Sequence, residues 1–334
     1  MPVAQKQHYH SVDLTKLVFV YLVVVWHSRL LDGIIYHGYL SVEFFFIMSG
    51  FFVNQSAEKY KTRFLAYVRD RLKKLYPHYL FSFLVMLFVS VATGSYVHQN
   101  YNLLAEILLI QDLGFTNGGI NYPCWYLSVL FWGVLPVLLA CQYFPKCVRG
   151  TIGIVLPILY FTYSIIFEDG RAEIWNRLFG IYLPVIRGIS MISLGATIYD
   201  LYCVLQNKGW YKRELLLQIT EVVALVAVIF FLLCPLNLDC LAVIFFCIFL
   251  LSILHKNAIL EKIGRAKPFR DISQIEYAVY LNHAAIVLLF NRFVVRSLHV
   301  RVAVLLILLI VAVSLYSVTT TALMGKIQKR LFRM

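Results

Sequence analysis

The sequence has little charge, and its acidic residues are fewer than its basic ones. Asp, Glu, Lys and Arg make up 14% of the 334 residues, well below the roughly 25% of a typical soluble domain. This shortage excludes an ordinary water-soluble chain, and the 61% share of hydrophobic residues indicates an integral membrane protein. The net charge is +13. The basic residues lie between apolar runs and do not form a basic face on a soluble module, so we expect no nucleic acid partner. The expected partners are membrane lipids with anionic head groups and phosphorylated small molecules.

Several familiar motifs are also absent. The first apolar run lacks a small-residue cleavage site, so we expect no removable signal peptide. Metal-ligand spacings, phosphate-binding glycine loops and dinucleotide fingerprints are missing, so no metal is expected. The seven cysteines are odd in number and lie mostly inside apolar runs, which favours packing roles over a disulfide framework. A disulfide between Cys234 and Cys240, which flank one short loop, is the alternative.

Long apolar runs are what the chain has instead. Runs of about 17 to 25 residues can cross a bilayer as helices. Ten candidate spans lie near 14-31, 38-55, 77-93, 124-144, 150-167, 178-205, 215-234, 238-255, 273-293 and 300-323. The stretch 101-113 is too short to span and carries Glu106, so we place it at the interface. The sequence therefore predicts an all-α polytopic membrane protein, a single domain over 1-334 with about ten transmembrane helices and no appended soluble domain.

Basic residues predict the orientation of these spans. Loops on the cytoplasmic side of a membrane are enriched in Lys and Arg. The segments between the spans alternate between many and few basic residues, and the segment 59-74 holds seven of them, whereas the long segment 94-123 has none. Both termini, including the N-terminal segment 1-13, are therefore predicted to be cytoplasmic.

Ionisable residues lie inside the first two spans. Lys16 and His27 are eleven residues apart, which places them within about 20° on one helix face and roughly 16 Å apart along the axis. One interpretation is that Lys16 reaches lipid head groups and His27 bonds a neighbouring helix; the other is a functional stripe. Glu43 lies at the depth of His27, so we hypothesise that its carboxylate pairs with the imidazole and orients it as a general base.

The basic segment ends in a candidate phosphate site. Arg71 and Lys74 are three residues apart and share a helix face at the predicted cytoplasmic end of the third span. Such a pair suits a phosphate group, with Arg69 and Lys73 as neighbours that assist. The alternative is that all four only anchor the orientation of the chain.

Taken together, these patterns resemble a known family. The resemblance is to the acyltransferase-3 family of integral-membrane acyltransferases, and it rests on five motifs in order: Asp13-x-x-Lys16-(ten residues)-His27, Gly38-x-x-Ser41-Val42-Glu43-Phe44-Phe45-x-x-x-Ser49-Gly50-Phe51, Arg71-x-x-Lys74-x-x-Pro77, Trp125-Tyr126-Leu127 and Tyr280-Leu281-Asn282-His283. The chain departs from the family pattern in having Lys16 and Lys74 where Arg is commoner, Glu43 where Asp is commoner and Ser41 where Gly is commoner. The charge signs are kept, although Lys does not reproduce the bidentate contacts of Arg.

The resemblance implies a chemistry and a location. Members of this family move an acyl group, commonly acetyl from acetyl-CoA, to a hydroxyl of a surface polysaccharide or its lipid-linked sugar precursor. We therefore expect a multi-pass protein of the bacterial inner (plasma) membrane, with acyl-CoA docked near Arg71 and Lys74. His27 is the expected base, and Lys16 is expected to hold a CoA phosphate or favour developing charge. Since the chain ends soon after its last span, transfer is expected to be completed by the membrane domain or a separate partner.

Other polar residues inside the spans have two interpretations each. Arg187 binds an acceptor carboxylate or phosphate, or pairs with an acidic residue of another helix. His283 makes an interhelical hydrogen bond or lines a tunnel. Trp125 belongs to the interfacial aromatic belt, which we favour, or stacks on a sugar. Ser49 and Gly50 are expected to permit close packing.

Two rival functions fit parts of the pattern. A transporter or flippase for a lipid-linked sugar would also need polar residues within its spans, but the sequence shows no inverted halves. A structural partner in a glycan-synthesis complex would leave the positions of His27 and Glu43 unexplained.

Overall fold

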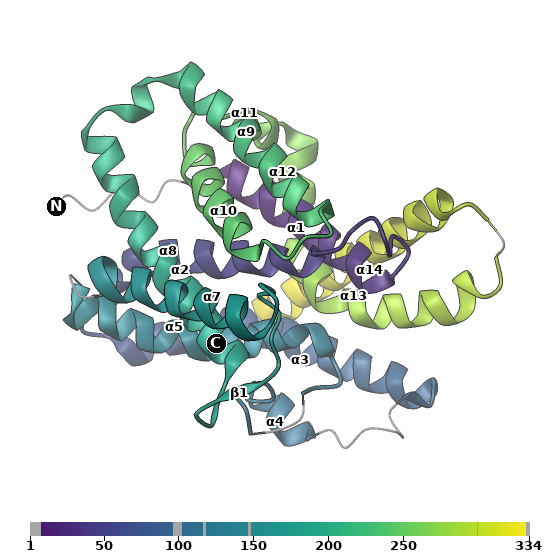
Figure 1. Cartoon of the computed structure of the whole chain (residues 1–334). Coiled ribbons are helices and arrows are strands. Elements are labelled where there is room, and N and C mark those ends of the chain that lie inside the picture. The colour runs from purple at the N-terminus through teal and green to yellow at the C-terminus, as the bar shows by residue number, and fades with distance from the viewer. Residues whose placement is uncertain (1–7, 96–101, 116–117, 146–147, 299, 332–334) are drawn as a thin grey trace.

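The structure is a computed structural model that describes residues 8–95, 102–115, 118–145, 148–298 and 300–331 (Figure 1). Three predictions fall partly outside the described residues. They are the N-terminal segment (residues 1–7), the interfacial stretch (residue 101) and the single domain over 1-334, whose ends 1–7 and 332–334 are not described.

Almost every described element is a helix. The α-helices are α1 (His10–Ser28), α2 (Ser41–Lys59), α3 (Phe64–Ala92), α4 (Leu103–Ile107), α5 (Trp125–Tyr143), α7 (Gly153–Phe167), α8 (Leu183–Asn207), α9 (Glu214–Leu233), α10 (Asp239–Ile253), α11 (Ile259–Arg265), α12 (Lys267–Ser273), α13 (Glu276–Phe290) and α14 (Val302–Leu331). Short 3-10 or π turns cover Gly38–Leu40, Tyr122–Cys124, Val148–Ile152, Trp210–Lys212 and Asn291–Val295. Within the described ranges, the strands are β1 (Arg177–Leu178) and β2 (Ile181–Tyr182), which pair antiparallel.

The prediction of an all-α polytopic membrane protein is confirmed. Among the described residues, 8 helical segments are long and apolar enough to cross a membrane, and each matches one predicted span. The other two predicted spans, 38-55 and 238-255, correspond to α2 and α10. α2 carries Glu43 and Asn54 and is therefore less apolar than the eight, and α10 is a shorter apolar helix.

The helix that contains the third predicted span begins before the span does. The sequence analysis began this span at Pro77, but α3 starts at Phe64 and continues through the proline. The residues before Pro77 are mostly good helix formers such as Leu, Arg and Lys, so the helix continues through Pro77 in spite of the backbone hydrogen bond lost there and the clash of its ring with the preceding turn. Arg71 and Lys74 therefore belong to the N-terminal part of α3.

Helix α2 lies at the centre of the molecule. In Figure 1 it crosses the middle, with α1 and α10 above it, α5 below it and α13 and α14 to the right; it packs most closely against α8. At this crossing a Cβ on Gly50 would lie 1.9 Å from the Ile192 carbonyl oxygen, and a Cβ on Gly195 would lie 1.9 Å from that of Ile47. Only glycine allows backbones to approach so closely, which confirms the packing role expected of Gly50.

Replacing Gly50 with Val should therefore prevent normal assembly of α2 and α8. Because the added side chain meets backbone and not a flexible side-chain end, we expect a loss of about 3 kcal/mol or more of stability. The yield of monodisperse protein after detergent extraction measures this. Gly325→Val is the matched control, because nothing lies within 4 Å of a Cβ at that position; equal yields of the two variants would contradict the packing described.

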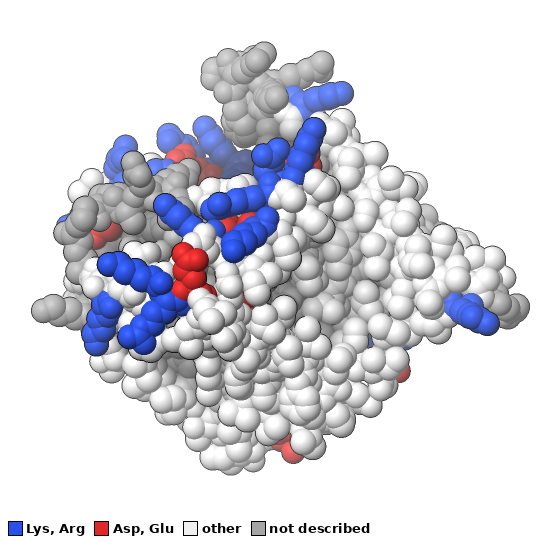
Figure 2. Space-filling model, turned by 90° about the horizontal axis from the view of Figure 1, so that it is seen from above, with Lys and Arg blue, Asp and Glu red and all other residues white. Residues whose placement is uncertain are grey.

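Charged side chains are unevenly spread over the surface. Figure 2 shows Lys and Arg gathered towards one end of the visible face, and a broad surface without charge separates them from a small basic group near the other end. A broad uncharged surface suits contact with the hydrocarbon core of a bilayer. The one-ended basic distribution agrees with the predicted orientation, in which the basic end is cytoplasmic.

Candidate functional site

His27, near the end of α1, lies against His283 of α13. His27 Nδ1 is 3.0 Å from His283 Nε2, and the two rings are stacked with their centroids 5.1 Å apart. His283 Nδ1 lies 2.7 Å from the carbonyl oxygen of Tyr280. The sequence analysis placed both histidines in the site as separate residues, and the fold brings them together.

The direction of these hydrogen bonds fixes the protonation of both rings. A carbonyl oxygen only accepts, so His283 Nδ1 carries a proton and donates it to Tyr280. In the neutral ring His283 Nε2 is then an acceptor, and His27 Nδ1 must donate to it. His27 Nε2 therefore keeps its lone pair. A neutral histidine in this tautomer can accept a proton at Nε2, and its orientation is set by the second histidine.

The histidine pair sits beside the segment that leads into α5. The ring of Tyr122 lies edge-on to His27 at 5.0 Å, and its side chain is 41% exposed. Asn121 donates hydrogen bonds to Ser82 and to the carbonyl oxygen of Leu281, and Tyr280 donates to the carbonyl oxygen of Pro123. These contacts tie α3, α5 and α13 together, so the position of His283 is held from several sides.

The carboxyl group of Glu106 holds this segment, and a second buried carboxyl group, that of Asp112, lies near Glu106. Glu106 accepts from the backbone N–H of Ile120 at 2.6 Å and of Asn121 at 3.4 Å, and burial raises the pKa of its carboxyl group. Burial, with a smaller contribution from Glu106, raises the pKa of Asp112 to about 7. The sequence analysis placed Glu106 at the membrane interface and gave it no contacts. In the structure its carboxyl group holds the chain just before Tyr122.

The predicted pair between His27 and Glu43 is wrong. Glu43 is fully buried, and Arg187 Nε of α8 donates to its Oε1 at 2.5 Å. Arg187 Nη2 also contacts the same carboxylate. Of the two interpretations of Arg187, the ion pair with another helix is the one formed. The pairing partners differ from those predicted because depth in the membrane was known from sequence, whereas the direction in which each side chain points was not.

The Glu43–Arg187 pair lies in an aromatic enclosure. The guanidinium carbon of Arg187 is 5.1 Å from the ring centre of Trp125 and 6.0 Å from that of Tyr39. Trp125 is only 8% exposed, so the favoured interpretation as a belt residue facing lipid is wrong; the side chain packs over a buried cation, an arrangement that stabilises the charge. Tyr39 in turn donates to Asp239 at 2.7 Å.

Glu173 joins this group from the segment between α7 and β1. It lies within electrostatic range of Arg187 and of Arg29. Burial raises the pKa of its carboxyl group, and the two guanidinium groups oppose that rise. The sequence analysis missed Glu173 and Tyr122, because neither falls inside an apolar run where a polar residue would stand out.

Lys16 lies in an ion-pair network at the predicted cytoplasmic end. Its Nζ is 2.9 Å from Glu276 Oε1 and 3.1 Å from Asp13 Oδ1. Lys74 lies within electrostatic range of all three of these residues and also of Arg71. Three of the predicted basic site residues are therefore brought together by α1, α3 and α13.

The four basic residues of α3 differ in their surroundings. Arg71 donates from Nη1 to Tyr67 at 3.1 Å, while its Nε is buried and has no hydrogen-bond partner among the described residues. Lys74 is exposed beside it. Arg69 is exposed and pairs with Asp70, and Lys73 is exposed. Arg71 thus presents an unused N–H toward the interior, as an anion site requires, whereas Arg69 and Lys73 face outward.

A possible metal group occurs at the start of α1. Ligand atoms of His8, His10 and Asp13 lie within 4.8 Å of one another. Asp13 Oδ2 is 2.8 Å from His8 Nε2, and its Oδ1 pairs with Lys16. An ammonium group 3.1 Å from the carboxylate opposes the approach of a cation, so these residues fit a metal poorly.

Comparison with known proteins identifies the family. The acyltransferase domain family of type 3 matches residues 9–323 of the chain. No curated protein matches the chain, and no solved structure does. The matched region contains the residues discussed above except His8 of the possible metal group. The chain therefore belongs to the acyltransferase-3 family and is a multi-pass membrane acyltransferase.

Proposed function

We propose that the protein is an O-acyltransferase of the bacterial inner membrane. It takes an acyl group, most simply acetyl, from cytosolic acyl-CoA and transfers it to a hydroxyl of a surface polysaccharide or its lipid-linked sugar precursor. The observation that carries this proposal is the hydrogen-bonded pair of His27 and His283, which leaves His27 Nε2 as a base. No metal takes part in the proposed chemistry.

His27 acts on the acceptor hydroxyl. As the hydroxyl oxygen attacks the thioester carbonyl carbon, its proton passes to His27 Nε2, and the bond from that carbon to sulfur then breaks. The proton returns from His27 to the departing thiolate, which leaves as CoA-SH, and the imidazole is neutral again. His283 stabilises the imidazolium that forms in between, because its Nε2 accepts from His27 Nδ1.

The length of the donor matches the spacing of Lys16 and His27 on α1. Lys16 and His27 lie about 16 Å apart along the helix axis. The arm of CoA between its pyrophosphate and its sulfur has about the backbone length of four residues, which spans roughly 15 Å when extended. Phosphates held by Lys16, Arg71 and Lys74 would therefore deliver the thioester to His27.

Arg71→Ala combined with Lys74→Ala should weaken acetyl-CoA binding by about 10- to 100-fold, because hydrogen bonds to charged groups contribute about 1.5 to 3 kcal/mol each. Isothermal titration of the purified protein with acetyl-CoA measures this. The matched control is Arg69→Ala with Lys73→Ala, which removes the same charges from the outward side of α3. An equal loss of acetyl-CoA affinity in both double variants would contradict the proposed site and would leave Arg71 and Lys74 only the role of setting the orientation of the chain.

Labelled acetyl-CoA tests the function itself. Membranes that contain the protein should incorporate the label into surface glycan, and membranes without it should not. Ester groups released from the glycan by mild alkali provide the readout. Intact sugar flux without label in the glycan would support the transporter instead, and a loss of all glycan synthesis without the protein would support a structural partner.

A further inference from the structure

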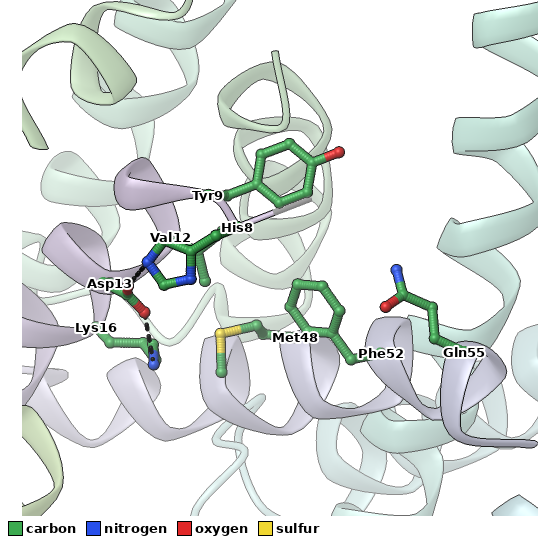
Figure 3. Close-up of a pocket in the computed structure, with 8 residues that line it drawn as sticks. All are labelled: His8, Tyr9, Val12, Asp13, Lys16, Met48, Phe52 and Gln55. Atoms are coloured by element: carbon green, nitrogen blue, oxygen red, sulfur yellow. Dashed lines mark ion pairs between the residues drawn. The ribbon is translucent and has the colours of Figure 1, made fainter. Parts of the chain in front are cut away.

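A cavity of about 450 Å³ lies between the start of α1 and the second half of α2 (Figure 3). Tyr9, Val12 and Lys16 line it from one side, at positions three and seven residues apart that share a face. The facing wall comes from α2, where Met48 and Phe52 are four residues apart on one face. The cavity lies at the predicted cytoplasmic end of α1, and its lining includes Lys16 of the basic group proposed for the CoA phosphates.

The walls of the cavity suit a flat aromatic group. Figure 3 shows the rings of Tyr9 and Phe52 on its two sides, with Met48 next to Phe52. The hydroxyl of Tyr9 is 2.8 Å from that of Tyr202, so the Tyr9 ring is fixed before any ligand binds. Fixed aromatic and thioether side chains are good surfaces on which a planar base stacks. A volume of this size falls within the range of small-molecule pockets.

The polar groups of the cavity lie at two ends. Gln55 presents an amide beyond Phe52 on α2 (Figure 3), which can both donate to and accept from the edge of a purine. Lys16 and Asp13 lie at the other end, and Lys16 is within electrostatic range of Lys74. A base held between the rings would therefore place the phosphates attached to its ribose beside these two lysines.

We propose that this cavity binds the adenosine part of the acyl-CoA donor; the proposal rests on the proposed function and adds the site that recognises the nucleoside. The base lies between Tyr9 and Phe52, Gln55 reads its edge, and the phosphates leave the cavity past Lys16. The purely apolar alternative, a lipid chain, would leave the Gln55 amide in the cavity wall without a ligand group to bond.

Two donors of different length test this assignment. Acetyl-CoA and acetyl-4′-phosphopantetheine carry the same thioester, but the second lacks the nucleoside. The wild type should have a KM for acetyl-CoA at least about tenfold lower than for the short donor, since stacking of one base contributes about 1 to 3 kcal/mol. Phe52→Ala and, separately, Gln55→Ala should raise the KM for acetyl-CoA towards that of the short donor, with kcat unchanged. Phe88→Ala, at a 73% exposed position of α3, is the control and should change neither KM.

Adenosine 3′,5′-bisphosphate provides a second readout. It should compete with acetyl-CoA in the wild type and lose at least tenfold in affinity in Phe52→Ala. Equal KM values for the two donors in the wild type, no competition by the bisphosphate, or a Phe52→Ala variant that affects both donors alike would each overturn the assignment. Those results leave transfer from both donors intact, whereas failure of both donors to react would instead contradict the proposed function.

Discussion

Replacing His27 with Ala should lower kcat for acyl transfer by about 10²- to 10⁴-fold, the usual contribution of a general base, while the protein remains folded in the membrane. The reason is that His27 Nε2 is the free basic atom of a pair whose other hydrogen bonds are fixed by His283 and the carbonyl oxygen of Tyr280. Initial rates with saturating acetyl-CoA measure the effect.

The same helix supplies the control for this experiment. Val18 lies on the exposed side of α1, so Val18→Ala removes side-chain atoms from α1 without touching the histidine pair and should retain wild-type kcat. Detergent-extracted His27→Ala should elute in size-exclusion chromatography as the wild type does, which separates loss of chemistry from loss of fold. Activity within threefold of the wild type would rule out His27 as the base.

Replacing Glu43 with Ala should destabilise the protein by about 3 to 5 kcal/mol, because it leaves the Arg187 guanidinium buried without its partner. Arg187 is 1% exposed and Glu43 is 0% exposed, so water does not replace the lost carboxylate. Thermal unfolding in detergent should show a fall in Tm of about 10 °C.

The double variant distinguishes pairing from a simple loss of packing. Glu43→Met with Arg187→Met removes both charges and keeps most of the buried volume, so it should be more stable than either single alanine variant. A Glu43→Ala variant with unchanged Tm, or a double variant no more stable than Glu43→Ala, would contradict the stabilising role of the pair.

The helices were predictable from sequence, because a bilayer sets the length of an apolar run that crosses it. Polar residues explain where the observed helices differ from the predicted spans. α2 has the length of a span but carries Glu43 and Asn54. α3 begins at Phe64, so its basic first turns extend the helix beyond the apolar run, towards the predicted cytoplasmic side. An apolar run marks where a helix meets hydrocarbon, and it does not mark where that helix begins.

The depth of each site residue in the membrane could be predicted from the sequence, but the contacts between their side chains could not. Helix rise places His27 and Glu43 at one level, yet the close crossing at Gly50 turns that face of α2 towards α8. Glu43 precedes Gly50 by seven residues and so shares its face, which directs the carboxylate to Arg187 and away from α1. A small residue seven positions from a buried charge was the available signal. His283 was identified from a motif, but its contact with His27 depends on how α13 packs against α1.

The most direct test of the account is the sidedness of transfer. Sealed inside-out membrane vesicles that carry the surface glycan precursor should be given labelled acetyl-CoA on their outer face, which is the original cytoplasmic face. The account predicts alkali-labile label in glycan that becomes accessible to a glycosidase only after the vesicles are opened, and no such label in vesicles with His27→Ala. Label that forms equally well when acetyl-CoA is supplied only to the opposite face, or that persists without His27, would contradict it.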